Sequence, residues 1–294
     1  MRVIFEPPIA EHDPTLYEAK TVTPVIEGFA AVGDEELQLY DRTGFLAIRN
    51  GFGSQATDAA LCALRTILCS DDPRCESIYF ESAIRDHLTL ASGSEREWAD
   101  ALPKVPSALR ASLVRKLMGF ITSYPALGAL AEEPELLRVI SQIIGEPIRC
   151  FQDMALIKPP YGQEKPWHQD HAYFNFPLEA RVVGVWIALT DVSPQMGCMH
   201  VVSGAHRAGP RPHFKRRDWQ ICDSEMRTYP RLAIAMQAGD VLLFDGKLPH
   251  GTPTNRTDRQ RFAVQFHFAG CSAIPTTDED RMAIFGSEGK DVRC

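Results

Sequence analysis

Short β-like segments follow one another through the second half of the chain, after Gly145. Apolar and β-branched residues dominate each segment, and Gly, Pro or Asp separates many of them. In order, they are 148–157, 182–189, 199–202, 232–236, 241–244 and 261–268. Many short strands that follow a run of helices are typical of a helical layer packed on a β-sandwich or jelly roll. The sequence therefore predicts an α+β protein with a jelly-roll core.

Periodic apolar residues predict helices in the first half of the chain. These helices are expected over 34–43, 54–68, 107–121 and 134–144. Gly145 is expected to end the last helix, because glycine readily takes the left-handed conformation at a helix end. A strand is expected over 44–49, whereas residues 78–91 fit neither period clearly. We interpret the helices as scaffolding.

The chain carries no internal repeat, low-complexity tract or linker, which indicates one domain over residues 1–294. Within this domain, the composition predicts four parts. They are an irregular N-terminal arm (1–33), a mainly helical support (34–147), the β core (148–270) and a C-terminal tail (271–294). The arm is expected to lie over the surface, because it is rich in proline and lacks any period.

Composition excludes several classes of function. The chain has 294 residues, of which 45% are hydrophobic and 23% are charged, as in an ordinary globular protein. A net charge of −7 without a basic block does not fit a nucleic-acid partner. The longest apolar run, Val182–Leu189, is too short to span a membrane. The eight cysteines form no Cys-x-x-Cys motif, so we expect free thiols and a cytoplasmic location.

The stretch from Pro166 to Phe176 contains His168 and Asp170, two residues apart. On an extended strand these two side chains point to the same face, where they can share one metal ion. His250, at the end of another predicted strand, is the candidate third ligand. Two histidines and one carboxylate form the facial triad of non-haem Fe(II) oxygenases, which leaves coordination positions open for substrate and O₂.

The strand expected over 261–268 has two different faces. Arg261, Gln265 and His267 alternate with phenylalanine and valine, so they share one face with a small alanine. Polar side chains rarely lie unpaired in a dry core, which indicates that this face looks into a cavity. A solvent-facing surface is the alternative. Arg261 suits bidentate binding of a dicarboxylate, and Arg259 is its competitor for that role.

Several motifs, in order and at similar spacing, resemble the phytanoyl-CoA dioxygenase family of Fe(II)/2-oxoglutarate oxygenases. They lie at 156–160, 167–170, 173–174, 185–188, 196–198, 203–207, 239–244, 249–251 and 261–263. Met196 stands where many relatives have Asn, so that motif matches only in part. The resemblance covers roughly residues 35–270, and together the motifs are more specific than any one alone.

The resemblance implies a double-stranded β-helix that holds iron through His168, Asp170 and His250. It implies that 2-oxoglutarate and O₂ are cosubstrates, and that an aliphatic C–H of a small organic substrate is oxidised with release of succinate and CO₂. The residues implied in 2-oxoglutarate binding are Arg261, Thr252, Gln152 and Trp186, with Lys158 and Gln169 as weaker candidates. Related halogenases lack the carboxylate ligand, so Asp170 favours hydroxylation or a related oxidation.

Two further groups of residues are candidates for contacting the substrate. The first group comprises the aromatic residues directly after the His-x-Asp motif, Tyr173, Phe174 and Phe176, together with Gln265, which shares the face of Arg261. The second group lies in the long charged segment 213–225 and comprises Arg216, Arg217 and Trp219. Long loops in compact domains are often lids or binding loops, so this segment is expected near the mouth of the active site. Packing of the aromatic residues, or a solvated insertion, are the alternatives.

Two other classes of function stay open from the sequence. A metal-binding jelly roll could catalyse a non-oxidative reaction, as a zinc hydrolase or an isomerase, or the scaffold could be a metal-free binding protein. Arg261 with Thr252 favours the oxygenase, because a zinc hydrolase does not need a dicarboxylate anchor. The intact set of three ligands disfavours the metal-free protein. The sequence leaves the oligomeric state and the substrate open.

Overall fold

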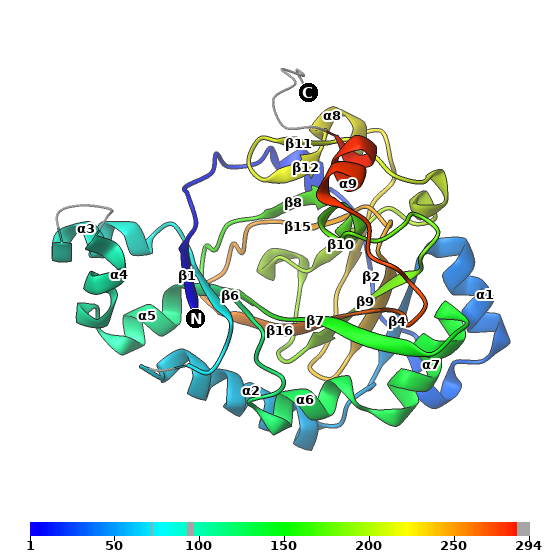
Figure 1. Ribbon diagram of the computed structural model, residues 1–294, viewed down its shortest axis with the longest axis horizontal. Coiled ribbons are helices and arrows are strands. Elements are labelled where there is room, and N and C mark those ends of the chain that lie inside the picture. Colours follow the sequence, from blue (N-terminus) through cyan, green and yellow to red (C-terminus); the bar gives the residue numbers. More distant parts are fainter. Residues whose placement is uncertain (72, 93–96, 287–294) are drawn as a thin grey trace.

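The computed structural model describes residues 1–71, 73–92 and 97–286. Two β-sheets face each other, and helices cover the outer side of the larger sheet (Figure 1). The strands of the larger sheet follow the order β1 (Arg2–Phe5), β5 (Ser77–Phe80), β6 (Val114–Met118), β7 (Ile148–Lys158), β16 (Arg261–Gly270), β9 (Val182–Ala188), β14 (Val241–Asp245), β4 (Phe45–Arg49) and β3 (Ile26–Glu27). Those of the smaller sheet follow the order β2 (Lys20–Val22), β13 (Leu232–Ile234), β10 (Met199–Val201), β15 (His250–Thr252) and β8 (Lys165–His168).

Most of the helices come from the first half of the chain. These are α1 (Asp34–Thr43), α2 (Ser54–Cys69), α3 (Ile84–Ser92), α4 (Trp98–Ala101), α5 (Ser107–Leu113), α6 (Pro125–Ala131) and α7 (Pro134–Ile144). The second half adds α8 (Asp223–Met226) and α9 (Asp278–Phe285), next to a hairpin of β11 (His213–Lys215) and β12 (Trp219–Ile221). This hairpin lies beyond the smaller sheet, on the side opposite to α2 and α6 (Figure 1).

Strand β16 shows how the two faces of the larger sheet differ. It pairs antiparallel with β7 on one side and with β9 on the other. Phe262 and Phe266 pack in the core beneath the helices, whereas Ala263 packs in the core between the sheets. Both faces of the strand are therefore covered. The predicted α+β fold, with a double-stranded β-helix core and helices on one sheet, is confirmed.

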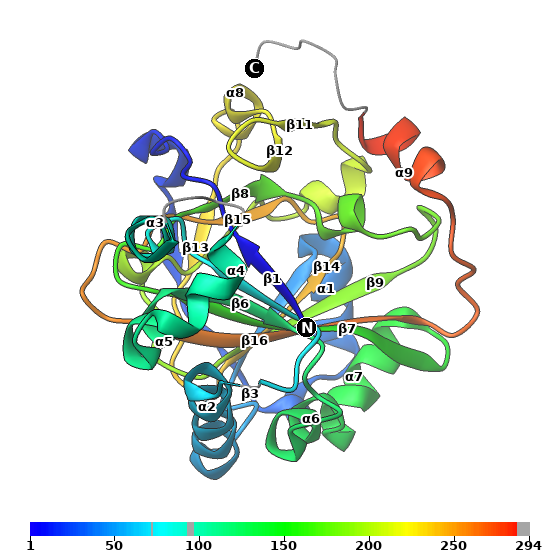
Figure 2. The same cartoon turned by 60° about the vertical axis from the view of Figure 1, so that its left-hand side comes forward.

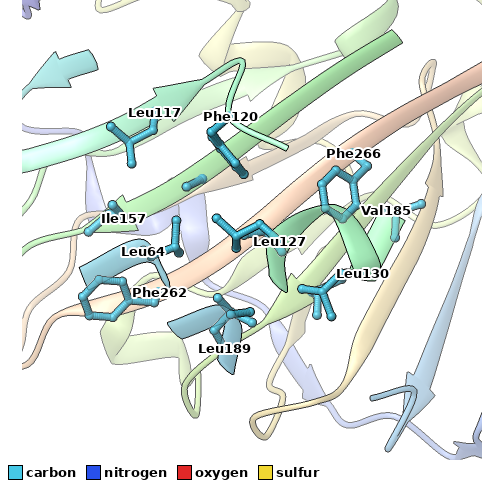
Figure 3. Close-up of a cluster of buried hydrophobic side chains, with 14 of the residues drawn as sticks. Leu64, Leu117, Phe120, Leu127, Leu130, Ile157, Val185, Leu189, Phe262 and Phe266 are labelled. Atoms are coloured by element: carbon cyan, nitrogen blue, oxygen red, sulfur yellow. The ribbon is translucent and has the colours of Figure 1, made fainter. Parts of the chain in front are cut away.

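The packing of helices on the larger sheet forms the main hydrophobic core. Leu64 of α2 and Leu127 of α6 meet Phe262 and Phe266 of β16 (Figure 3). The view in Figure 2 places α2, α6 and α7 together beneath this sheet. Full burial of such a side chain contributes about 1.5–3 kcal/mol. The core fixes the larger sheet, which leaves its other face free to build a site against the smaller sheet.

The helix expected over 107–121 is wrong in its second half. Helix α5 ends at Leu113, and the chain continues as β6 between β5 and β7. The spacing of Leu113 and Leu117 fits a helix, but pairing with two neighbouring strands satisfies the backbone of this segment equally well. Tertiary pairing therefore overrides the local period. The undecided stretch 78–91 divides into β5 and α3.

The two ends of the chain carry more structure than expected. Residues 1–33 were expected to form an irregular arm, yet they supply β1 and β3 to the larger sheet and β2 to the smaller one. These strands pair in parallel with distant segments, and no local pattern could reveal that pairing. Helix α9 lies in the expected C-terminal tail, where Thr277 caps its first turn.

The seven cysteines within the described residues are free thiols, as predicted, and Cys294 lies outside those residues. The cytoplasmic location inferred from these thiols stays a prediction. No helix in the described part of the chain is long and apolar enough to cross a membrane.

Truncation of Leu64 tests the main core. Leu64 is 0% exposed, so Leu64→Ala should lower the free energy of unfolding by about 2–5 kcal/mol, because it leaves a cavity under the sheet. Urea denaturation would measure this change. The matched control is Leu90→Ala, because Leu90 is 87% exposed and should change stability by no more than about 0.5 kcal/mol. Equal losses in the two variants would contradict this description of the core.

Candidate active site

Three side chains that can bind a metal converge between the two sheets. Strands β8 and β15 pair antiparallel and set His250 opposite His168. The Oδ1 atom of Asp170 lies 3.3 Å from Nε2 of His168 and 3.6 Å from Nε2 of His250. One ligand atom from each residue lies within 4.8 Å of the others, and all three residues are buried. The sequence therefore identified side chains that meet in space.

Asp170 reaches this position from a turn rather than from a strand. Strand β8 ends at His168, and Asp170 begins a 3₁₀ turn, Asp170–Tyr173. Gln169 between them points the other way, where its side chain bonds the carbonyls of Gly209 and Lys247 and the amide of Arg211. Gln169 therefore fixes the loop and does not line the site.

Backbone carbonyls orient both imidazoles. Nδ1 of His168 lies 2.7 Å from the carbonyl of Pro166, and Nδ1 of His250 lies 2.9 Å from that of Leu248. A carbonyl only accepts, so each Nδ1 carries the hydrogen and each Nε2 lone pair faces Asp170. Burial and the neighbouring His168 lower the pKa of His250 to about 4. Both imidazoles thus present Nε2 to a metal ion.

The second oxygen of Asp170 is also occupied. Its Oδ2 lies 2.7 Å from Nε2 of His267 and 3.2 Å from Nε2 of Gln265. Burial alone would raise the pKa of Asp170, but the neighbouring His250 and His267 and the hydrogen bonding of the carboxylate hold this pKa well below the usual range. Asp170 is therefore a carboxylate. His267 was not predicted as a site residue, although its shared face with Arg261 was the available signal.

Two buried cations lie in the same inter-sheet space. Arg261 is 3% exposed, and its guanidinium donates to the carbonyls of Gly197 (2.8 Å) and Leu156 (3.3 Å). Lys158 is 4% exposed, and its ammonium donates to Oγ1 of Thr252 (3.0 Å) and to the carbonyl of Pro253 (2.6 Å). The contacts described for both groups are with uncharged oxygens, which only partly replace the lost hydration of a cation.

Burial disfavours the charged form of both groups. Burial and the neighbouring Arg261 hold the pKa of Lys158 well below its usual range, and burial lowers the pKa of Arg261 to about 10. Nε of Arg261 has no described partner. A bound anion would supply the missing partner and the missing negative charge. This arrangement fits the predicted roles of Arg261, Lys158 and Thr252 as an anion site.

Trp186 and Gln152 lie on the inner face of the larger sheet, as their predicted roles require. The guanidinium of Arg261 lies 5.3 Å from the ring centre of Trp186, and the indole Nε1 has no described partner. Gln152 sits directly opposite His267 across β7 and β16. Arg259, the alternative to Arg261, instead lines a separate surface cavity with Arg65 and Phe262. Arg261 thus lies buried at the start of β16, whereas Arg259 precedes the strand and is exposed.

Lys116 on β6 also faces this space, and sequence reasoning missed it. It pairs with Leu156, which pairs in turn with Ala263, so all three share the inner face. Its ammonium lies 3.8 Å from the ring centre of Tyr79. Burial and then the nearby Lys165 lower the pKa of Lys116 to about 8. The incorrect helix over 107–121 concealed this residue.

Aromatic rings close one side of the metal-binding cluster. The ring of Tyr173 stands edge-on to His168, with centres 5.6 Å apart. Phe174 lies 4.8 Å from the ring centre of His267, and Phe151 packs against both Phe174 and Phe176. Phe174 and Phe176 are each 8% exposed. These two rings form one wall of the site, whereas Tyr173 extends to the opening of the site.

The charged segment 213–225 lies at this opening. Arg216, Arg217 and Trp219 line a cavity of about 980 Å³ together with Tyr173 and residues 6–11. The hydroxyl of Tyr173 donates to the carbonyl of Trp219 (2.7 Å) and accepts from Lys165 (3.0 Å), whose ammonium also pairs with Asp218 (2.5 Å). The hairpin is therefore linked to the metal-binding cluster through Tyr173.

Arg217 anchors the hairpin rather than facing the cavity as a free charge. It pairs with Glu164, whose side chain is 1% exposed, and donates two bonds to Asp223, at 2.6 and 2.9 Å. Tyr17 also donates to Glu164 (2.9 Å). His171, His200 and His206 lie within hydrogen-bonding distance of backbone carbonyls, as expected for structural residues.

Removal of the Arg217 charge tests this anchor. Arg217→Met should lower the free energy of unfolding by about 3 kcal/mol, because it leaves the buried Glu164 carboxylate with the Tyr17 hydroxyl as its remaining partner among the described residues. The control is Arg256→Met, whose ion pair with Glu11 is half-exposed and should contribute at most about 1 kcal/mol. Chemical denaturation measures the free energy of unfolding of both variants. A loss in Arg217→Met no larger than that in Arg256→Met would contradict the role of Arg217 as an anchor.

Comparison with known proteins identifies similar sequences and folds. The family model described as phytanoyl-CoA dioxygenase (PhyH) matches residues 40–263. Peroxisomal phytanoyl-CoA dioxygenase of Homo sapiens is 32% identical over 149 residues, which are 46% of this chain and 44% of that protein. The chain thus spans about half the length of this relative. Ectoine dioxygenase of Bordetella bronchiseptica is 26% identical over 269 residues, which are 84% of this chain and 76% of that protein.

A solved structure has the same fold. The epimerase SnoN of nogalamycin biosynthesis, in complex with Fe³⁺, α-ketoglutarate and nogalamycin RO, superposes with a TM-score of 0.63 at 18% identity. The match covers 88% of this chain and 93% of SnoN. At this identity the likeness concerns the fold alone.

Proposed function

The chain belongs to the phytanoyl-CoA dioxygenase family, and from this premise we propose that it is an Fe(II)- and 2-oxoglutarate-dependent oxygenase. One observation carries the proposal. A buried triad of two imidazoles and a carboxylate shares an inter-sheet space with the buried cations Arg261 and Lys158. The triad suits a divalent metal, and the two cations suit an organic anion.

The donor set fits ferrous iron. His168, Asp170 and His250 would hold the ion on one side, and three coordination positions would stay open. Zinc enzymes also use two histidines and a carboxylate, so the triad alone does not separate the two metals. The cations separate them, because a zinc hydrolase has no need of a buried site for a second organic anion. Arg261 and Lys158 therefore favour the oxygenase over a hydrolase.

The residues near Arg261 fit 2-oxoglutarate. Its distal carboxylate would pair with the guanidinium of Arg261 and would take a hydrogen bond from Thr252, whose hydroxyl Lys158 already orients. Trp186 would form one wall of this pocket, and Gln152 would face the other end of the cosubstrate. In the related-fold protein SnoN the same dicarboxylate accompanies iron, which supports this assignment by analogy.

Bound iron, 2-oxoglutarate and O₂ would supply the oxidising power, with succinate and CO₂ as products. The chain's own contribution is position and exclusion of water. The carbonyls of Pro166 and Leu248 fix the two imidazole rings, and Arg261 fixes one end of the cosubstrate. The wall of Phe174 and Phe176 keeps the site apolar next to the metal.

We propose that the substrate is a small organic molecule oxidised at an aliphatic C–H. It would enter by the cavity beside Tyr173, which Arg216 and Trp219 also line. Similar proteins are named for unlike molecules, a phytanoyl thioester, ectoine and nogalamycin, so family membership leaves the substrate class open. Gln265 is a candidate substrate contact. Because its side chain donates to Asp170, it would contact only a part of the substrate that lies next to the metal.

Loss of Asp170 tests the metal assignment. Anaerobic addition of Fe(II) and 2-oxoglutarate should produce a weak visible charge-transfer band, and Asp170→Ala should remove it, because two imidazoles alone hold the ion weakly. Asp278→Ala is the control, since the Asp278 carboxylate is 72% exposed and lies on α9. Absence of the band in the unaltered protein, or an unchanged band in Asp170→Ala, would contradict the proposal.

Loss of Arg261 tests the cosubstrate assignment. Arg261→Met should raise the dissociation constant for 2-oxoglutarate by about 30-fold or more, because truncation of a buried charge partner costs about 2 kcal/mol or more. Titration of the charge-transfer band measures this constant. Arg259→Met is a matched control two positions away, since Arg259 is exposed and lines the outer cavity. Similar effects at the two arginines would contradict the assignment.

A further inference from the structure

The two oxygens of the Asp170 carboxylate have different neighbours. Oδ1 faces the imidazoles of His168 and His250, at 3.3 and 3.6 Å. Oδ2 faces away from them and meets Nε2 of His267 at 2.7 Å and Nε2 of Gln265 at 3.2 Å. One oxygen is thus directed at the metal-binding cluster, and the other is held by β16.

Chemistry fixes the direction of these hydrogen bonds. A carboxylate only accepts, so His267 and Gln265 both donate to Oδ2. The two nitrogens also lie 3.0 Å from each other, so the amide and the imidazole approach Oδ2 side by side. His267 therefore carries its hydrogen on Nε2, and its Nδ1, which has no described partner, is a lone pair facing apolar surroundings. The Asp170 contact is the polar contact that fixes this ring.

His267 is held too firmly to follow a moving carboxylate. It is 0% exposed, and the rings of Phe151, Phe174 and Phe244 surround it at centre distances of 6.0, 4.8 and 6.5 Å. Its strand pairs with β7 and with β9, so the backbone is fixed from both sides. A rigid donor next to a rotatable carboxylate determines where that carboxylate points.

We propose that His267, assisted by Gln265, is a positioning residue that keeps Asp170 a single-oxygen ligand of the metal. With Oδ2 occupied, Asp170 binds through Oδ1 alone, and the coordination position that Oδ2 would take in a two-oxygen mode stays open. Hydrogen bonds to a ligating carboxylate orient it in this way. The inference rests on the proposed function only in that it assumes a metal at the triad.

Three substitutions separate a donor from a mere space filler. His267→Phe keeps a ring of similar size in the aromatic cage but removes the donor. His267→Gln places an amide nitrogen near the position of Nε2, whereas the shorter His267→Asn places one near Nδ1, out of reach of Oδ2. His87→Phe is the control, because His87 is exposed on α3.

The direct readout is binding of Co(II), which needs neither 2-oxoglutarate nor turnover. His267→Phe should weaken Co(II) binding about 10–100-fold, the usual effect of losing a partner of a metal ligand. It should also change the intensity of the visible Co(II) absorption, because a carboxylate that binds through both oxygens raises the coordination number. His267→Gln should restore most of the affinity and the spectrum, and His267→Asn should not.

Each outcome decides the inference. Unchanged Co(II) affinity and absorption in His267→Phe would overturn it. If His267→Phe does not fold, as judged by near-UV circular dichroism, Gln and Asn are compared: stronger binding by His267→Gln supports the inference, and equal binding overturns it. Failure of the proposed function gives a different result. The unaltered protein then shows no Fe(II)/2-oxoglutarate band, while the difference in Co(II) binding between the variants persists.

Discussion

The structure depends on uncompensated charges of both signs that share one buried space. Asp170 contributes a carboxylate whose neighbours are imidazoles and an amide, and Arg261 and Lys158 contribute cations whose described contacts are uncharged oxygens. Isolated buried charges are unfavourable unless they are paired or coordinate a metal. A divalent ion would balance the charge of the carboxylate, and a dicarboxylate would balance the charges of the two cations. The site is thus completed by ligands of opposite charge.

The fold explains why such a site can persist. Helices α2, α6 and α7 cover the outer face of the larger sheet with an apolar core, so its inner face can carry polar groups without loss of the fold. Strand β16 lies at the centre of this arrangement. Its outer residues pack under the helices, while its inner residues provide the buried cation Arg261 at one end and the Asp170 partner His267 further along. One rigid strand therefore positions both halves of the chemistry.

Local pattern was sufficient for part of this description. The spacing of His168 and Asp170 predicted that the two side chains meet, although Asp170 lies on a 3₁₀ turn beyond the strand. The alternation along 261–268 predicted that Arg261 shares one face with Gln265 and His267, because the backbone period of a strand fixes side-chain direction. The core strands and most helices were predicted for the same reason.

The remaining features depend on contacts between distant segments. The helical spacing within 107–121 concealed β6, and with it Lys116, because the strand exists only through pairing with β5 and β7. The parallel strands of residues 1–33 escaped prediction for the same reason. The shared face of Arg261 and His267 could be predicted, but not that Asp170, 97 positions earlier in the chain, would meet His267.

The central claim is that metal and dicarboxylate complete each other's charge balance in one buried space, and binding coupling tests it most directly. Calorimetric titration of 2-oxoglutarate into the anaerobic protein, with and without Mn(II), measures this coupling. The account predicts that the metal tightens 2-oxoglutarate binding more than about tenfold, which corresponds to a coupling of about 1.4 kcal/mol or more. Equal affinity with and without the metal would contradict it.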